Sequence, residues 1–70
     1  MAEVMRHRSS HIDETVYDHD THELQITFTD GRTYRYEDVP RGTYTELVTS
    51  ASVGRAFNAL IRDRFDGEET

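Results

Sequence analysis

Residues 23–37 alternate between apolar and polar side chains. The apolar positions fall at every second residue: Leu24, Ile26, Phe28, Tyr34 and Tyr36. Alternation with a period of two is typical of β-strands that bury one face, and Asp30-Gly31 between the two runs is a common hairpin turn. The pattern therefore predicts an antiparallel β-hairpin.

The length of the hairpin loop follows from parity. A two-residue loop would place Tyr34 and Tyr36 on the face opposite to Phe28, whereas a three-residue loop over 29–31 brings all the apolar side chains to one face. The longer loop also puts Gly31 in the left-handed position of a type I turn with a bulge, which suits glycine. The predicted pairs are Leu24 with Tyr36, Ile26 with Tyr34 and Phe28 with Arg32. The tyrosines are then core residues and not an exposed platform for stacking bases.

A weaker strand precedes the hairpin over residues 12–18. Ile12 and Val16 share one of its faces. Tyr17 takes the other face unless a bulge intervenes, and an outward Tyr17 could stack a base.

Two helices are predicted after the hairpin. The first begins at Pro40, whose missing N–H costs nothing in a first turn, or at a capping box that starts at Thr43. The second is capped by Ser52 and runs through Arg64. Its apolar side carries Val53, Phe57, Leu60 and Ile61, and its opposite side carries Arg55, Asn58 and Arg62.

These elements predict an α+β fold, a three-stranded antiparallel meander covered on one face by two C-terminal helices. We expect the domain to span residues 9–65. Residues 1–8 and the acidic segment 66–70 are expected to be flexible, because apart from Val4 and Met5 they contain nothing to hold an ordered terminus.

The composition narrows the functional classes. The chain has 70 residues, enough for one small domain, and its lack of cysteine excludes disulfides and thiolate metal sites. No apolar run approaches the roughly 20 residues that span a bilayer, and the first residues lack the apolar stretch of a signal peptide. We expect a soluble, cytoplasmic protein without a membrane partner.

The charge balance is acidic. Fourteen aspartates and glutamates face eight arginines and no lysine, for a net charge of −6. Such a charge opposes non-specific binding to a phosphate backbone. Either GC-rich codon usage or adaptation to salt explains this composition, and the sequence favours neither.

The sequence gives little support to catalysis. Asp18-His19-Asp20 and His22 have the residue types of a metal site, but their spacing matches no ligand pattern and indicates a solvated turn. Carboxylates occupy polar faces and turns, and there is no catalytic triad, nucleophile elbow or phosphate-binding loop. We expect no enzymatic activity, no cofactor and no metal.

One candidate site remains, at the start of the second helix. A helix N-terminus offers N–H groups, Ser52 offers a hydroxyl, Gly54 lets a ligand approach, and Arg55 and Arg62 can hold an anion. The simpler interpretation, which we favour, is that Ser52 is a cap, Gly54 allows close packing and the arginines are solvated.

Three segments, residues 9–18, 27–40 and 51–65, together resemble the KTSC domain. The shared marks are Tyr34-x-Tyr36, Val39-Pro40, and the run Ser52-x-Gly54, Phe57-Asn58, Ile61-Arg62. The chain departs from the family in having Thr15-Val16 before Tyr17, where a small residue such as glycine is common. The family occurs alone in microbes and at the carboxyl end of some lysyl-tRNA synthetases, and the resemblance implies a possible role in RNA binding.

Two functions are therefore considered. The first is a weak, salt-sensitive RNA or nucleic-acid accessory module. Its candidate residues are Arg35 on the open sheet face and Ser52, Gly54, Arg55, Asn58 and Arg62 on the second helix. The second is a protein-interaction module or small homodimer, since a small sheet with free edges gains from association.

Overall fold

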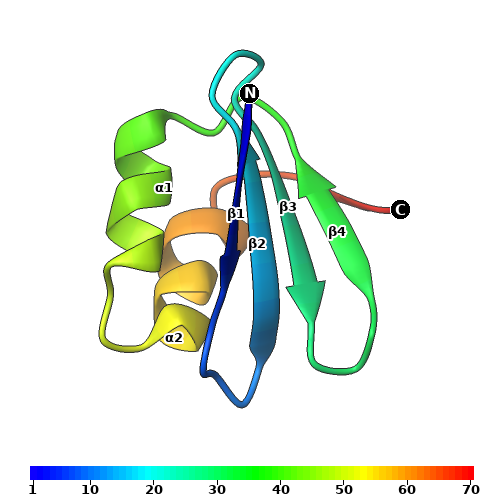
Figure 1. Ribbon diagram of the computed structural model, residues 1–70, viewed down its shortest axis with the longest axis vertical. Helices are drawn as coiled ribbons and strands as arrows, with labels where there is room; N and C mark the ends of the chain where they lie inside the picture. The colour runs from blue at the N-terminus through cyan, green and yellow to red at the C-terminus, as the bar shows by residue number, and fades with distance from the viewer.

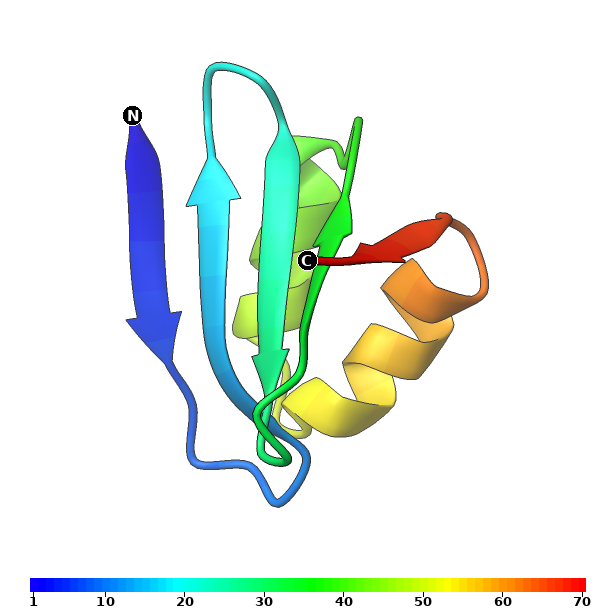
Figure 2. The same cartoon turned by 90° about the vertical axis from the view of Figure 1, so that its right-hand side faces the viewer.

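The computed structural model describes all 70 residues as one antiparallel sheet with helices on one face (Figure 1). The strands are β1 Ala2–Arg6, β2 Ile12–Asp18, β3 Glu23–Phe28, β4 Thr33–Tyr36 and β5 Gly67–Glu69, in the order β1-β2-β3-β4-β5. The helices are α1 Arg41–Val48 and α2 Val53–Phe57, and α2 continues into a wider π-helical stretch, η1, over Asn58–Arg62. In Figure 2 the sheet stands in front of α1, and α2 lies to the side beyond β4, so the sheet face toward the viewer carries no helix.

The hairpin of β3 and β4 confirms the predicted register, but Phe28 and Tyr34 on its apolar face are only half-buried and are not core residues as expected. Leu24 pairs with Tyr36 and Ile26 pairs with Tyr34. The loop closes with a 2.8 Å hydrogen bond from the amide of Phe28 to the carbonyl of Arg32. Gly31 has φ of 92°, the left-handed conformation that glycine adopts without strain.

The α+β class is confirmed, but the prediction of three strands is wrong, because the sheet has five. Residues 2–6 and 67–69, which the sequence places in flexible ends, form β1 and β5. β1 pairs with β2 from Ala2 to Arg6, and β5 pairs with β4 from Gly67 to Glu69. Their mobility stays a prediction, but both segments belong to the sheet.

β1 is not predicted from the sequence, because polar side chains occupy positions of this segment that face the helices. Glu3 and His7 lie on the helix side of the sheet together with Met5. Glu3 accepts a hydrogen bond from the hydroxyl of Tyr44 at 3.0 Å, and His7 Nε2 lies 2.9 Å from Thr15 Oγ1. The inward face of β1 is therefore satisfied by hydrogen bonds, which a search for alternating apolar residues does not detect.

A bulge in β2 settles the orientation of Tyr17. The pairing with β3 shifts register between Ile12 and Glu14, so that Ile12, Thr15 and Tyr17 all reach the buried face. Tyr17 has an exposed fraction of 0%, and its hydroxyl donates to the carbonyl of Val39 at 2.6 Å. The suggestion that an outward Tyr17 stacks a base is therefore wrong.

The helices begin at the predicted residues. Pro40 precedes α1, with no side-chain cap, and Ser52 caps α2. The expected regular helix to Arg64 instead widens at Asn58 and ends at Arg62. No helix of the structure is both long and apolar enough to cross a bilayer.

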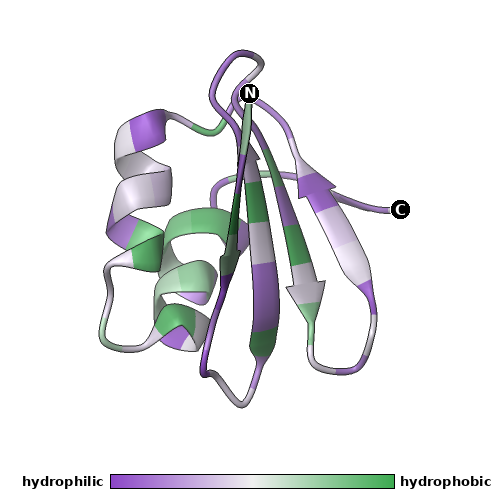
Figure 3. Ribbon diagram, in the orientation of Figure 1, coloured by the Kyte–Doolittle hydropathy of each residue, from purple (hydrophilic) through white to green (hydrophobic).

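The core lies between the sheet and the helices, where the apolar positions gather (Figure 3). Its ten buried residues are Ile12, Tyr17, Leu24, Ile26, Tyr36, Val39, Tyr44, Leu47, Phe57 and Ile61. The rings of Tyr17 and Tyr44 stack at 4.3 Å, which joins α1 to β2. Burial raises the pKa of Tyr44 well above its ordinary range, so its hydroxyl stays protonated and donates to Glu3.

Candidate nucleic-acid interface

Four of the six predicted binding residues line one shallow hollow where α2 begins. This hollow, the serine hollow, has a volume of about 300 Å³ and lies between α2 and the loop that joins β1 to β2. Its lining residues are Ser9, Ser10, His11, Ser52, Gly54, Arg55 and Asn58. The structure thus brings part of the predicted site together with a loop that is distant in the sequence.

The loop wall of the serine hollow is fixed by local hydrogen bonds. Ser9 Oγ accepts from the amides of His11 and Ile12, both at 3.1 Å. Thr29 makes two hydrogen bonds to the same loop. Its amide donates to the carbonyl of His11 at 3.0 Å, and its hydroxyl donates to the carbonyl of Ser10 at 3.1 Å. The proton of the Ser9 hydroxyl remains free to donate to an anion.

The α2 wall offers fewer backbone donors than expected. The sequence suggests that the amides of residues 52–55 face a ligand. In the structure the amide of Ser52 donates to Ser50 Oγ at 3.1 Å, and the amide of Arg55 donates to Ser52 Oγ at 3.5 Å. These two amides are already engaged, so the side chains carry most of the binding capacity of this wall.

Gly54 lies directly against the loop between β1 and β2. A Cβ added at this position would be 3.4 Å from the Cβ of His11 and 3.8 Å from Ser9 Oγ. A side chain here would therefore occupy the floor of the serine hollow. These distances fit the close packing suggested for Gly54, and access for a ligand stays a prediction.

Charges are segregated along the molecule. Residues 6–14, 29–32 and 50–58, which lie together at the lower end in Figure 1, carry four arginines and three carboxylates, Asp13, Glu14 and Asp30. Residues 18–23 and 36–39, at the upper end, carry five carboxylates and no arginine. An acidic protein thus has one end with a small excess of arginines, here called the basic end, and the serine hollow opens there.

Two arginines at this basic end have no acidic partner. Arg8 and Arg55 take part in none of the ion pairs of the structure. Arg6 and Arg32 each face a carboxylate at 3.9 Å, a distance typical of weak, exposed pairs. Arg8 and Arg55 are therefore the guanidinium groups most available to an anion.

The structure places Arg35 away from the serine hollow. It lies on the open sheet face, as predicted, between Glu23 at 3.6 Å and Glu68 at 3.5 Å. Its Nε atom is buried without a hydrogen-bond partner. Two flanking carboxylates cancel the charge of Arg35, so it contributes little to an anion site.

Arg62 lines a second cavity, the aromatic hollow, which has a volume of about 350 Å³. Its lining residues are His11, Phe28, Asp30, Arg32, Tyr34, Tyr36, Phe57, Asn58 and Arg62. The aromatic rings pack edge to face, for example Phe28 with Tyr34 at 5.8 Å. The two hollows share His11 and Asn58, so they form one continuous strip across the basic end.

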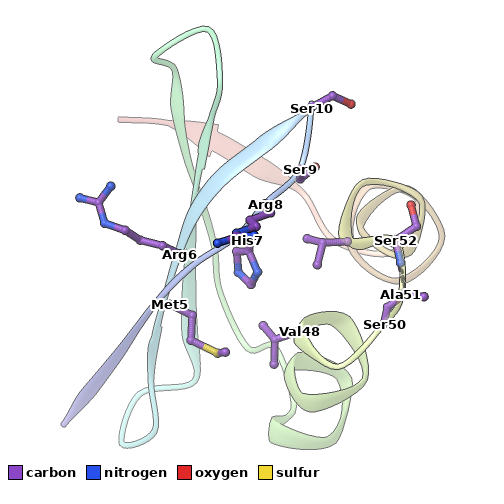
Figure 4. A pocket seen from close by; sticks show the side chains of 11 residues that line it. Met5, Arg6, His7, Arg8, Ser9, Ser10, Val48, Ser50, Ala51 and Ser52 are labelled. Atoms are coloured by element: carbon purple, nitrogen blue, oxygen red, sulfur yellow. Dashed lines mark hydrogen bonds between the residues drawn. The ribbon is translucent and has the colours of Figure 1, made fainter.

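A third hollow of about 490 Å³ lies between β1 and the connection from α1 to α2 (Figure 4). In Figure 4 Met5, His7 and Val48 face the space, whereas Arg6 points away from it. Burial lowers the pKa of His7. This hollow shares Ser9, Ser10 and Ser52 with the serine hollow and adds Arg8 to the basic end.

Sequence reasoning missed the loop from Arg8 to His11. Arg8 falls in the start that is expected to be flexible, whereas residues 9–11 fall inside the predicted domain without a role in the site. The contact of this loop with α2 depends on tertiary packing. The only available signal was Ser9-Ser10-His11-Ile12 at the start of the family resemblance.

The aspartates and histidines of the β2–β3 turn have structural roles. Asp18 Oδ1 accepts from the amides of Asp20 and Thr21 at 2.8 and 3.2 Å, which closes the turn. His19 Nε2 lies 2.9 Å from Glu3 Oε1 and thereby joins the turn to β1.

Comparisons with known proteins agree with this fold. The KTSC domain family matches residues 8–65. A relative from Tsukamurella paurometabola, named only "Protein", is 37% identical over 57 residues, which cover 81% of this chain and 85% of that protein. An "Uncharacterized protein" from Stutzerimonas stutzeri is 34% identical over 55 residues, 79% of this chain and 78% of that one. The crystal structure of a KTSC domain protein from Yersinia pestis has a TM-score of 0.90 at 30% identity and covers 100% of this chain and 99% of its own.

Proposed function

This chain belongs to the KTSC domain family, and on that premise we propose that it is a non-catalytic module whose basic end binds single-stranded RNA weakly. The observation that carries the proposal is the segregation of charge. Four arginines gather at one end of a protein with a net charge of −6, and Arg8 and Arg55 there have no acidic partner. A local positive patch attracts a polyanion even when the whole molecule is acidic.

The chemistry of the serine hollow supports a phosphate as the group bound. Arg8 and Arg55 supply positive charge beside the hydroxyls of Ser9, Ser10 and Ser52. Guanidinium and hydroxyl groups are frequent partners of nucleic-acid phosphates.

The same side chains favour RNA over DNA. Serine hydroxyls and the amide of Asn58 can each donate or accept a hydrogen bond with a ribose 2′-hydroxyl, the group that distinguishes RNA from DNA. The shallow hollow admits a flexible single strand more readily than a rigid duplex.

The test is a titration with a short single-stranded RNA, followed by amide shifts at several salt concentrations. We expect shifts in residues 8–11 and 52–58, and weak affinity. If Arg8 and Arg55 each neutralise one phosphate, the logarithm of the binding constant should fall against the logarithm of salt with a slope of roughly −1.4.

Matched arginine variants locate the binding. Arg55→Ala should reduce the affinity and bring the salt slope closer to zero by about 0.7. Arg41→Ala is the control, because Arg41 is also exposed and unpaired but lies at the start of α1, beside the acidic end. Equal effects of the two variants, or no shift in residues 8–11 and 52–58 at low salt, would refute RNA binding at the basic end.

A second function, self-association or protein binding, is favoured by the free edge of β1. β1 is the first strand of the sheet, and Val4 on it has an exposed fraction of 59%. An open edge with an apolar side chain can pair with another strand. This function predicts amide shifts in residues 2–6 that depend on protein concentration without RNA, and Val4→Lys should abolish them.

A further inference from the structure

We infer that the aromatic hollow holds one unstacked base of a bound single strand. The inference rests on the proposed RNA binding and adds which part of the nucleotide is recognised. The hollow lies between the β3–β4 hairpin and α2, next to the serine hollow, and it has a different lining.

The floor of the aromatic hollow is suited to a flat ring. Phe28, Tyr34, Tyr36 and Phe57 contribute their rings, and Phe28 and Tyr34 stay only half-buried although they belong to the apolar face of the sheet. Half-exposed aromatic rings in a concave site are the usual partners of unpaired bases. The volume of about 350 Å³ lies at the lower end of the range of ligand sites, which is roughly 300–1,000 Å³.

The rim supplies groups for the rest of the nucleotide. Arg32 and Arg62 line the hollow, and their only acidic partners are Asp30 at 3.9 Å and Asp63 at 3.6 Å. All four of these side chains are mostly exposed, so both ion pairs are weak and a phosphate can compete for the arginines. Asp30 also lines the hollow and opposes an anion there.

The position of the two hollows fits one nucleotide and its phosphate. His11 and Asn58 border both hollows, so a base on Tyr34 leaves its sugar at Asn58 and an adjacent phosphate near Arg55. A base inside a duplex cannot reach such a hollow without leaving its stack. The occupant is therefore a single strand with at least one base turned out.

The experiment compares an oligoadenylate of six nucleotides with an abasic ribose-phosphate oligomer of the same length and charge. We expect the oligoadenylate to bind about tenfold more tightly, as stacking of one base predicts. We also expect contacts between adenine protons and the ring protons of Phe28 and Tyr34 in nuclear Overhauser spectra. Equal affinities and no ring contacts would overturn the inference.

Variants of Tyr34 separate the base from the phosphate. Tyr34→Thr removes the ring from a half-buried strand position and should abolish the preference for the oligoadenylate while leaving the affinity for the abasic oligomer unchanged. Tyr34→Phe, the matched control, keeps the ring and should keep the preference. If Tyr34→Thr does not fold, the wild-type protein decides, because nuclear Overhauser contacts between adenine protons and the rings of Phe28 or Tyr34 require the base to lie in the hollow.

Failure of this inference can be told from failure of the proposed function. If both oligomers bind equally and Arg55→Ala weakens both, the basic end binds phosphate and no base is held. If neither oligomer shifts any amide at low salt, RNA binding and base recognition are both refuted.

Discussion

Phe57 attaches α2 to the sheet. Its ring packs edge to face against Phe28 at 5.2 Å and Tyr36 at 5.8 Å, and only 3% of Phe57 is exposed. We expect Phe57→Ala to lower the free energy of unfolding by about 3–5 kcal/mol, because it leaves a cavity between helix and sheet. Urea denaturation measures this loss, which is a large share of the stability of so small a domain. Phe28→Ala should cost less, since Phe28 is only half-buried. An almost unchanged midpoint for Phe57→Ala would mean that α2 is not docked.

At the scale of single residues, the sequence predicts the face of the sheet that a side chain occupies when the residues around it alternate regularly. Ile26 and Tyr36 are placed correctly because the strict alternation around them fixes their face. Tyr17 is not, because one extra residue at the bulge of β2 reverses the face of everything after it. A bulge leaves no signal in the hydrophobic pattern, so Tyr17 could be placed only by its contacts.

At the scale of elements, β5 depends on the absence of a side chain at Gly67. A Cβ at this position would come within 2.6 Å of the ring of Tyr36, which is itself buried in the core. We expect Gly67→Ala to displace β5 and to accelerate amide exchange in residues 67–70 while the core stays intact. The control is Gly42→Ala, where nothing lies within 4 Å of the added Cβ. Because Gly42 lies in α1, alanine there should stabilise the protein by about 0.5–1 kcal/mol. Identical exchange of residues 67–70 in both variants would argue against the close contact with Tyr36.

We expect the attachment of β1 to depend on pH through Glu3. Hydrogen bonds with His19 and Tyr44 lower the pKa of Glu3 below its ordinary value of 4.5. A carboxyl group whose pKa is lower in the folded state stabilises the fold above its ordinary pKa, and this contribution disappears as the pH falls through the folded value. Amide exchange of β1 should therefore accelerate below about pH 4.5. Because the chemical rate of exchange also changes with pH, the exchange of β3 amides in the same sample is the reference. Glu3→Gln removes this titration, and an unchanged acid response in that variant would exclude Glu3 as its cause.

The elements also show which residues of the candidate site could be grouped from the sequence and which could not. Ser52, Gly54, Arg55 and Asn58 could be found together because one helix carries them. Ser9, Ser10 and His11 could not be added, because only the folded sheet brings the β1–β2 loop to α2. Arg35 was grouped with the site by its charge, although Glu23 and Glu68 offset that charge in the structure.

At the scale of the whole molecule, the segregated charges predict two opposite responses to salt. Carboxylates crowd the end formed by residues 18–23 and 36–39, so screening should relieve their repulsion and raise the melting temperature steadily from low to molar KCl. The affinity for RNA should fall over the same range, because counterions compete for the basic end. Thermal melts and titrations of the same samples test both. A flat melting temperature would leave codon usage as the explanation of the acidic, lysine-free composition.

The return of the chain to the sheet as β5 affects how readily the sheet can pair with another molecule. Strands β1 to β4 pair with their neighbours along the chain, and only β5 comes back from the far side of the helices to cover the edge of β4. β5 is three residues long and fully exposed, and it carries Glu68 and Glu69. A short, charged outer strand is a poor template for pairing with another molecule. We therefore expect the acidic tail to reduce aggregation, because a chain that ends before Gly67 would present the unpaired edge of β4 to its own copies.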